Sequence, residues 1–272
     1  MPNAEQGKDG RFVKTYGVNE KFLDNIGKEQ AWFLGIMASD GCIVNDNLFS
    51  VSQSNDEGLK MIEYIKNLIG FTGKIYKSNN AYAIQISSRK LIEKMKEYNI
   101  INKKSLTYTF PEKLSPEYHS SFLRGYIDGD GCVTISSNGN LKYNTRYLVL
   151  CFVGTEQFIK VCEKLTPKGS HTYKIKNATN CCDLRWNGEK AIEAGKWFYE
   201  DPDLYKGKKY FAYKDFADNY TPKYKKYEPK REEFKKLFEE GIKISEIEKR
   251  IGIPFQTLYI WKKSMGLGQT KN

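Results

Sequence analysis

Two aspartates, Asp40 and Asp130, each stand directly before a glycine at the end of an apolar, helix-like stretch. The stretches read FLGIMASDGC over 33–42 and LRGYIDGDGC over 123–132, so the two copies are offset by 90 residues (130 minus 40). A helix C-terminus is already partially negative, so two acids gathered there call for a compensating positive charge. Carboxylate and carbonyl oxygens are the ligands of hard cations such as Mg²⁺, which also accept phosphate oxygens. The pattern therefore predicts a divalent-metal site, and in a basic protein it points to phosphodiester hydrolysis.

Each copy also carries two small residues four positions apart, which places them on one face of a helix. These are Gly35 with Ser39 in the first copy and Gly125 with Gly129 in the second. Small faces let two helices approach backbone to backbone, and the duplication supplies the partner. We therefore expect the two helices to pack against each other at the centre of the molecule, with both aspartates close together. A single aspartate–glycine pair would be an ordinary turn, whereas the duplicated spacing favours the metal site.

The segments that follow each motif also match, because both halves alternate strand-like and helix-like runs in the same order. Both read αββαββα, over 29–115 and 116–218 after an N-terminal extension of 1–28. The fold class predicted is α+β, with two pseudo-twofold repeats. Strand-like runs cover 42–45, 48–54, 73–78 and 81–88 in the first repeat, and 132–137, 146–154, 171–177 and 181–188 in the second.

The tail differs in character from the repeats. Residues 219–231 are rich in Lys and Tyr with two prolines and no apolar period, which predicts a basic linker. Residues 232–272 predict three short helices. The first ends at Gly241, the second opens with a capping box of Ser245 and Glu248, and the third runs from Pro254 to about Met265.

A helix, a turn containing glycine and a second helix make the helix-turn-helix arrangement, whose second helix reads the DNA major groove through its N-terminal end. We therefore expect a small all-α DNA-binding domain here. Gln256, Thr257 and Tyr259 would lie near the end that enters the groove, with Lys262 and Lys263 further along, toward phosphates.

Composition sets the partner and the compartment. The 272 residues carry a formal charge of +11, which favours a polyanionic partner through counterion release. The six cysteines include no CxxC pair, which is typical of a reduced intracellular compartment. The polar N-terminus and the lack of a long apolar run predict a soluble protein that is not exported and has no membrane partner, in a bacterial or phage-encoded cytoplasm or an organelle.

At the two motifs the sequence resembles the LAGLIDADG homing endonucleases. Their nine-residue motif matches LRGYIDGDG over 123–131 closely and FLGIMASDG over 33–41 more loosely, with Ala38 in place of the motif's earlier acid. The resemblance covers roughly residues 30–220. It implies a monomer whose motif helices form an internal interface, and whose two four-stranded antiparallel sheets make a saddle over the major groove of double-stranded DNA with a long recognition site.

The resemblance also implies which residues do the chemistry. Asp40 and Asp130 would bind the catalytic metals, Mg²⁺ or another divalent cation such as Mn²⁺, with the main-chain carbonyls of Ser39 and Gly129 as further ligands. The two sites would cut opposite strands across the minor groove and leave short 3′ overhangs. Three further catalytic positions match the family: Lys104 and Lys209 would order solvent at the scissile phosphate, and Gln53 would close the second strand of the first repeat. The second repeat offers no amide there, which predicts two unequal active sites.

Alternation along the strands suggests which residues face DNA. If Ile75, Ile84, Ile86, Tyr173, Ile175, Leu184 and Trp186 face the helices, then the residues between them point to the other side of each sheet. Arg or Lys on guanine and Gln on adenine are the usual major-groove pairings. The residues expected on the DNA side are Lys74, Tyr76, Gln85, Lys174, Lys176 and Arg185.

Two functions from different classes fit these features. One is a site-specific double-strand DNA endonuclease, which is a metal-dependent phosphodiester hydrolase. The alternative is a protein that keeps the fold without cutting DNA, as a transcription regulator or as an intron RNA maturase. A pure binder would be expected to lose the metal acids, and both Asp40 and Asp130 are present, which favours the enzyme.

Overall fold

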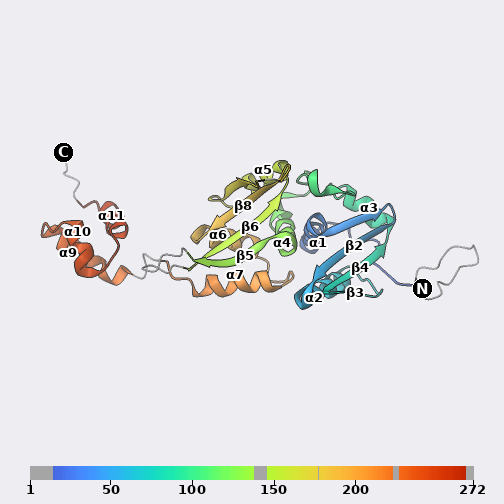
Figure 1. The fold of residues 1–272 in the computed structure, drawn as a ribbon, viewed down its shortest axis with the longest axis horizontal. Coiled ribbons are helices and arrows are strands. Elements are labelled where there is room, and N and C mark those ends of the chain that lie inside the picture. Colours follow the sequence, from blue (N-terminus) through green and yellow to red (C-terminus); the bar gives the residue numbers. More distant parts are fainter. Residues whose placement is uncertain (1–14, 138–145, 177, 223–226, 268–272) are drawn as a thin grey trace, which may run out of the picture. The chain divides into compact units, whose positions relative to one another are not determined.

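The computed structural model describes residues 15–137, 146–176, 178–222 and 227–267. The chain divides into two compact units, Met1–Ala217 and Asp218–Asn272. The first unit holds both repeats, and the second holds the C-terminal helices (Figure 1). Each unit is described by itself below.

The two repeats have the predicted order αββαββα. The first consists of α1 (Lys28–Ser39), β1 (Gly41–Asn45), β2 (Leu48–Ser54), α2 (Asn55–Leu68), β3 (Tyr76–Ser78), β4 (Ala81–Ser87) and α3 (Arg89–Lys96). The second consists of α4 (His119–Asp130), β5 (Cys132–Ser137), β6 (Arg146–Gly154), α5 (Glu156–Leu165), β7 (His171–Lys174), β8 (Cys182–Asn187) and α6 (Glu189–Phe198). An additional helix, α7 (Lys208–Asn219), follows the second repeat and was not expected from the sequence.

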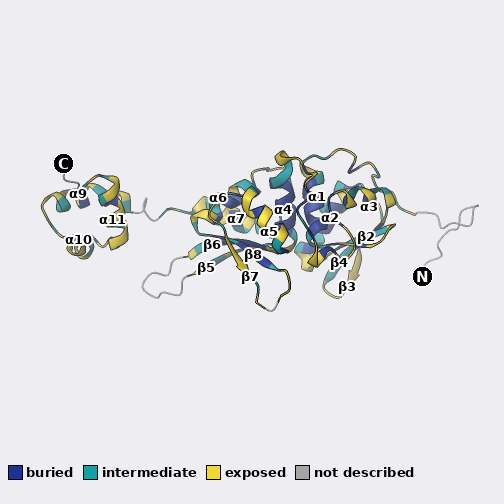
Figure 2. Ribbon diagram, turned by 90° about the horizontal axis from the view of Figure 1, so that it is seen from above, coloured by how far each residue is buried: buried dark blue, intermediate teal, exposed yellow. Residues whose placement is uncertain are grey.

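Each repeat builds one four-stranded antiparallel sheet, and the two sheets have equivalent strand orders, β1-β2-β4-β3 and β5-β6-β8-β7. Alternation along the strands decides which side packs on the helices. In β4, Ile84 and Ile86 are buried and Gln85 between them is exposed. In β8, Leu184 and Trp186 are buried in the same way. Both sheets therefore keep one face for the helices and leave the other open (Figure 2). The predicted α+β fold with two sheets is confirmed.

Helices α1 and α4 lie side by side at the centre of this unit, between the two sheets (Figure 1). Their contact depends on glycine, because a Cβ atom on Gly35 would lie 2.0 Å from the main-chain oxygen of Phe122. The relation is reciprocal, since a Cβ atom on Gly125 would lie 2.0 Å from the main-chain oxygen of Trp32. The predicted backbone-to-backbone packing of the two motif helices is confirmed.

A buried polar network ties α4 to the chain that follows α6. Arg124 is fully buried and donates to the main-chain oxygens of Asp201 (2.5 Å), Leu204 (3.1 Å) and Tyr205 (2.5 Å). One turn later on the same helix, the carboxylate of Asp128 lies 3.8 Å from the Arg124 Nε atom. A buried charge is tolerated when it is paired and hydrogen-bonded in this way. The network fixes the segment that leads into α7.

The same carboxylate joins the two repeats. The indole Nε1 of Trp32 in α1 donates to Asp128 Oδ2 at 2.9 Å. Burial raises the pKa of Asp128 to about 6, while the Trp32 hydrogen bond and the Arg124 charge act in the opposite direction. This acid occupies the position at which the first motif has Ala38, so the cross-repeat bond exists in one direction.

The second unit packs three helices, α9 (Arg231–Glu239), α10 (Ile244–Ile251) and α11 (Phe255–Ser264), around a small apolar core. Gly252 ends α10 with a φ of +71°, in the left-handed region that glycine adopts readily. The predicted capping box of Ser245 and Glu248 is wrong, because α10 begins at Ile244 and the Glu248 carboxylate accepts instead from the N–H of Phe255, at 3.0 Å. The acid therefore caps α11.

The basic linker expected over 219–231 is shorter than predicted. Helix α7 reaches Asn219, a 3₁₀ turn covers Glu228–Lys230, and α9 already begins at Arg231. Residues 223–226, which carry much of the predicted linker, lie outside the described residues.

A methyl group at the α1–α4 contact should be costly. We expect Gly125→Ala to lower the free energy of unfolding by about 3 kcal/mol or more, because overpacking against main chain outweighs the better helix propensity of alanine, about 1 kcal/mol. Urea denaturation measures this. The control is Gly17→Ala, whose Cβ atom would meet Thr72 at 3.7 Å, an ordinary contact. Equal stability losses in the two variants would contradict the close packing.

Removing the buried carboxylate should also destabilise the first unit. We expect Asp128→Ala to cost about 3–5 kcal/mol, because it leaves Arg124 and the Trp32 N–H without their partner. Asp128→Asn keeps an acceptor for Trp32 and should cost less. Thermal and urea denaturation compare both variants with Asp46→Ala, whose exposed side chain pairs with Lys96 at 2.7 Å. A midpoint for Asp128→Ala no lower than that of the control would refute the role of the network.

Candidate active site

The two motif aspartates lie at the C-terminal ends of the paired helices. Asp40 caps α1, and its N–H donates to Ile36 O at 2.9 Å. Asp130 is the last residue of α4. The Asp40 carboxylate reaches across the interface, since a Cβ atom on Gly129 would lie 2.5 Å from Asp40 Oδ2. The structure thus brings the two acids together as the repeat predicted.

Gln53 binds the first of these acids. Its Nε2 donates to Asp40 Oδ2 at 2.5 Å from the end of β2. Burial raises the pKa of Asp40 to about 6, and the neighbouring charge of Asp130 raises it further, while the Gln53 bond works against both. Two carboxylates at adjoining helix ends therefore leave the site short of positive charge.

Lys104 and Lys209 supply part of that charge from inside the protein. Lys104 is buried and donates to Gly41 O at 2.5 Å. Lys209, at the start of α7, donates to three carbonyls at the end of α4, those of Ile127 (2.9 Å), Asp128 (3.0 Å) and Gly129 (2.5 Å). Burial lowers the pKa of both lysines, and the nearby acids counteract it. Both lysines act as caps on negative helix ends.

Two main-chain carbonyls were expected to assist. The carbonyl of Gly129 accepts from Lys209, and its second lone pair is still available to another partner. Ser39 lies opposite Gly129 in the helix interface, with its hydroxyl bonded to Gly35 O (3.2 Å) and Ile36 O (3.1 Å). Both residues therefore border the acid pair.

The second repeat has no counterpart of Gln53. Cys42 pairs with Ser50 and Cys132 pairs with Cys151, so Gln53 and Gly154 each stand three residues after equivalent positions. A Cβ atom on Gly154 would lie 2.6 Å from the Phe158 ring. The absence of an amide is thus imposed by packing, and the two acids have different surroundings.

In the first repeat the packing is reversed. A Cβ atom on Gly58 in α2 would lie 2.8 Å from the Cβ atom of Gln53. The equivalent position in α5, counted from the helix N-caps Ser54 and Thr155, is Ile159. A small residue on the helix accompanies the glutamine in one half, and a large one accompanies the glycine in the other.

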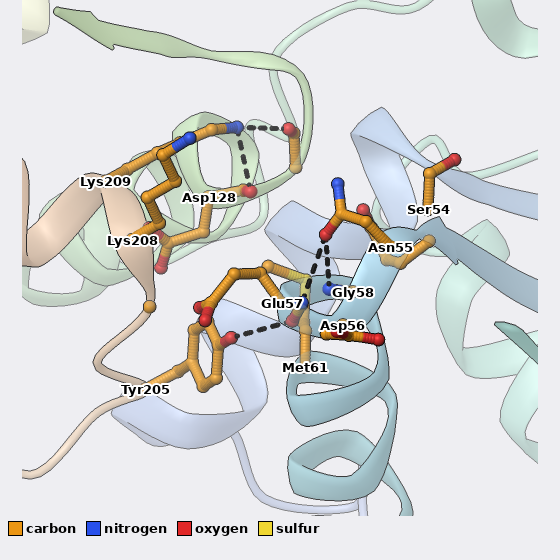
Figure 3. Close-up of a pocket in the computed structure, with 13 residues that line it drawn as sticks. Ser54, Asn55, Asp56, Glu57, Gly58, Met61, Asp128, Tyr205, Lys208 and Lys209 are labelled. Carbon is orange, nitrogen blue, oxygen red and sulfur yellow. Dashed lines mark hydrogen bonds between the residues drawn. The ribbon is translucent and has the colours of Figure 1, made fainter. Parts of the chain in front are cut away.

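A cavity of about 390 Å³ adjoins the acid pair. Its walls come from both repeats, with Asp128, Tyr205, Lys208 and Lys209 on one side and the N-terminal turn of α2 on the other (Figure 3). Lysine and carboxylate side chains thus share an opening beside the candidate site. Arg124, Asp128 and Lys208 were not identified as functional residues from the sequence, although Asp128 is the earlier acid of the second motif.

The open face of the first sheet carries two of the predicted DNA-binding residues. Tyr76 is 55% exposed and pairs with Ala83, which lies on the same face as the exposed Gln85. Lys74 is exposed just before β3, and Ile75 packs against the core as expected. This side of the sheet has the residue placement that alternation predicted.

In the second sheet the assignment of β7 is wrong. Tyr173 pairs with Asp183 and is 50% exposed, so it lies on the open face rather than against the helices. Lys174 pairs with the buried Cys182, and its Nζ lies 3.8 Å from Glu156 of α5, so it lies on the helix side. Pairing with β8 sets the orientation of this four-residue strand.

Arg185 does lie on the open face of the second sheet, where it is opposite His171. Its guanidinium is half-buried and donates to Asp183 at 2.6 Å. Lys176 is exposed in the turn after β7. The arginine is therefore held by a neighbouring acid.

In the second unit the predicted contact residues split into two groups. Gln256 and Tyr259 are exposed on α11, and so is Lys263. Thr257 and Lys262 are half-buried, and the Lys262 ammonium lies 5.2 Å from the ring centroid of Phe238 in α9. Packing within the unit thus holds two of the five.

The donor chemistry of the acid pair fits a hard divalent cation, because it offers carboxylate and carbonyl oxygens and has an unbalanced negative charge. Within the described part of the chain, three or more His, Cys, Asp or Glu side chains do not gather at any point as a metal cluster. Over the same residues, no helix is long and apolar enough to cross a membrane. A metal here would therefore depend on the acid pair, main chain and substrate oxygens.

Comparison with curated proteins gives a partial sequence match. A stretch of 127 residues is 31% identical to a large subunit of the A-type ATP synthase of Pyrococcus abyssi, and the match covers 44% of this chain and 12% of that protein. This chain thus spans a small fraction of that relative's length. No protein-family model matches the chain.

Solved structures give a much wider match. Meganuclease I-SmaMI bound to uncleavable DNA shares 17% identity, with a TM-score of 0.51 over 71% of this chain and 90% of that one. The LAGLIDADG meganuclease I-AabMI bound to uncleaved DNA (14%, 0.52) covers the same shares, 71% and 90%. The LAGLIDADG homing endonuclease I-GzeII in complex with its DNA target (14%, 0.51) covers 71% and 89%. The chain therefore has the fold of the LAGLIDADG homing endonucleases.

Proposed function

We propose that this protein is a site-specific double-stranded DNA endonuclease that hydrolyses phosphodiester bonds with Mg²⁺ or another divalent cation such as Mn²⁺. The observation that carries the proposal is the meeting of Asp40 and Asp130 at the ends of two adjacent helices, between two sheets with open faces. The neighbouring structures support it, because they are meganucleases bound to DNA, and one of the I-SmaMI structures was obtained in the presence of calcium ions.

The residues of the site divide the work. Asp40 and Asp130 would hold the cation, with the carbonyls of Ser39 and Gly129 beside them. When bound, a divalent cation neutralises charge on the phosphate and lowers the pKa of the attacking water. Gln53 fixes the orientation of the Asp40 carboxylate through its 2.5 Å bond. Lys104 and Lys209 place positive charge beneath the helix ends, where negative charge on the phosphate would develop.

The sheets and the second unit would hold the DNA. Tyr76, Gln85 and Lys74 lie on or beside the open face of the first sheet, and Arg185 lies on that of the second. A long recognition site follows from two such faces. Since one chain supplies both carboxylates, the active form would be a monomer, with the helix-turn-helix as an accessory binding domain.

A transcription regulator or RNA maturase on the same fold would bind nucleic acid without cutting DNA. Such a protein has no use for two acids whose mutual repulsion raises the pKa of Asp40. The retained acid pair, with Gln53 bonded to one member, favours the endonuclease.

Removing either acid should abolish double-strand cutting. The substrate is first obtained by incubating the protein and Mg²⁺ with a randomised duplex library and sequencing the cut ends. We expect Asp40→Asn and Asp130→Asn each to lower the rate of double-strand cleavage about a thousandfold or more, because the amide keeps the shape but loses the charge that attracts the metal. DNA binding should persist. Asp46→Asn, at an exposed surface acid, is the control, and unimpaired cutting by either motif variant would sink the assignment.

The two strands should respond differently to loss of the amide. We expect Gln53→Ala to slow cutting of one strand about tenfold or more and to leave the other nearly unchanged, because the second repeat has glycine at this position. Separate end labels on the two strands measure both rates and the nicked intermediate. Asn67→Ala removes an exposed amide from α2 and should leave the ratio unaltered. Equal slowing of both strands would rule out unequal sites.

A further inference from the structure

The outward face of α11 combines apolar and basic side chains. Leu258 and Trp261 are buried against the other two helices, so the opposite side of α11 points to solvent. That side carries Phe255 (41% exposed), Tyr259 (42%) and Ile260 (62%). Three large exposed hydrophobic side chains on one ten-residue helix call for a partner.

Two polar residues complete this face. Helical spacing puts Gln256 and Lys263 at its centre, almost opposite the buried side, with Tyr259 and Ile260 flanking them. Both are exposed. The Lys263 ammonium lies 5.6 Å from the Tyr259 ring centroid, and the rings of Phe255 and Tyr259 stack at 6.3 Å with an interplanar angle of 12°. The aromatic side chains are therefore ordered against each other before any partner binds.

Charge indicates the kind of partner. Helix α11 contains Lys262 and Lys263 and no acidic residue, whereas the acids of the three helices lie on α9 and α10. The core of a protein–protein interface is depleted in lysine, which disfavours a protein at a face centred on Lys263. A polyanion of a width that admits a helix is the better match, and the DNA major groove has that width.

Side-chain chemistry then indicates the bases. A glutamine amide pairs with the N6 and N7 atoms of adenine, and apolar side chains contact the 5-methyl group of thymine. Gln256 lies in the first turn of α11, with Tyr259 and Ile260 in the next, which is the part of a recognition helix that reaches base edges. Lys263, one turn further on, would contact a phosphate.

We propose that the face formed by Phe255, Gln256, Tyr259, Ile260 and Lys263 reads A·T base pairs in the major groove of one flank of the DNA target, with Ile260 on a thymine methyl group and Gln256 on adenine. This inference rests on the proposed endonuclease function. It replaces Thr257 and Lys262, which the sequence suggested as contacts, with Ile260 and Lys263.

The first test is a selection of randomised duplexes by binding, with the full-length chain in its Asp130→Asn form so that DNA stays uncut. We expect the selected sites to contain an A·T-preferring segment on one flank. The preference should disappear from sites selected by the same chain carrying Gln256→Ala and Ile260→Ala, while the rest of the site stays the same. Val161→Ala, which trims a 38% exposed side chain on α5, serves as the control and should change nothing.

The second test isolates the methyl group. Replacing the flank thymines of a selected duplex with deoxyuridine removes the methyl groups and leaves base pairing intact. We expect the affinity of the Asp130→Asn chain to fall about fivefold per contacted thymine, and the loss to vanish when Ile260→Ala is added. The outward position of Ile260 makes misfolding of this variant easy to detect, since its unfolding midpoint should match that of the parent.

The outcomes separate the two proposals. If a site is selected and cut by the unmodified chain but its flank responds neither to deoxyuridine nor to the α11 substitutions, the base-reading role is overturned and the endonuclease function stands. If the full-length chain neither selects nor cuts any duplex, both proposals fail. An unaltered DNA selection together with loss of a protein complex upon Ile260→Ala would assign the face to a protein partner and overturn the inference.

Discussion

The contact between α1 and α4 is the interaction on which the rest of the first unit depends. Main chain meets main chain there, because Gly35 and Gly125 have no side chain to hold the helices apart. That approach sets the separation of the two acids and also sets the two sheets on either side of the helix pair (Figure 1). Stability and chemistry therefore share one set of atoms, and neither can be adjusted without affecting the other.

Close packing at two helix ends creates an electrostatic problem, which the chain solves from within. Both ends are negative and each carries an acid, so buried lysines bond to the carbonyls beneath them. Lys209 can reach those carbonyls because Arg124 anchors the chain just before α7. The compensation is incomplete, since the pKa of Asp40 remains raised. What is left over is an affinity for a further positive charge at the surface.

The sequence predicted the features that repeat or alternate and missed those that depend on one-off contacts. Duplication and strand periodicity were enough for both αββαββα halves, the helix interface and the acid pair. Helix α7 was missed because its pattern is weak, and Tyr173 was placed on the wrong face because β7 takes its orientation from β8. The partners of Asp128 lie far away in sequence, where no local pattern can indicate them.

The exchange of large and small residues around the strand ends limits how this molecule can change over generations. Gln53 fits because position 58 is glycine, and position 154 is glycine where Phe158 and Ile159 fill the space. Restoring a glutamine at 154 alone would create a clash, and shrinking Ile159 alone would leave a void. Each single step is penalised while the pair is tolerated, which is epistasis between neighbours. Two halves that began as copies have thus become difficult to equalise again, and the inequality of the two sites is protected by the core itself.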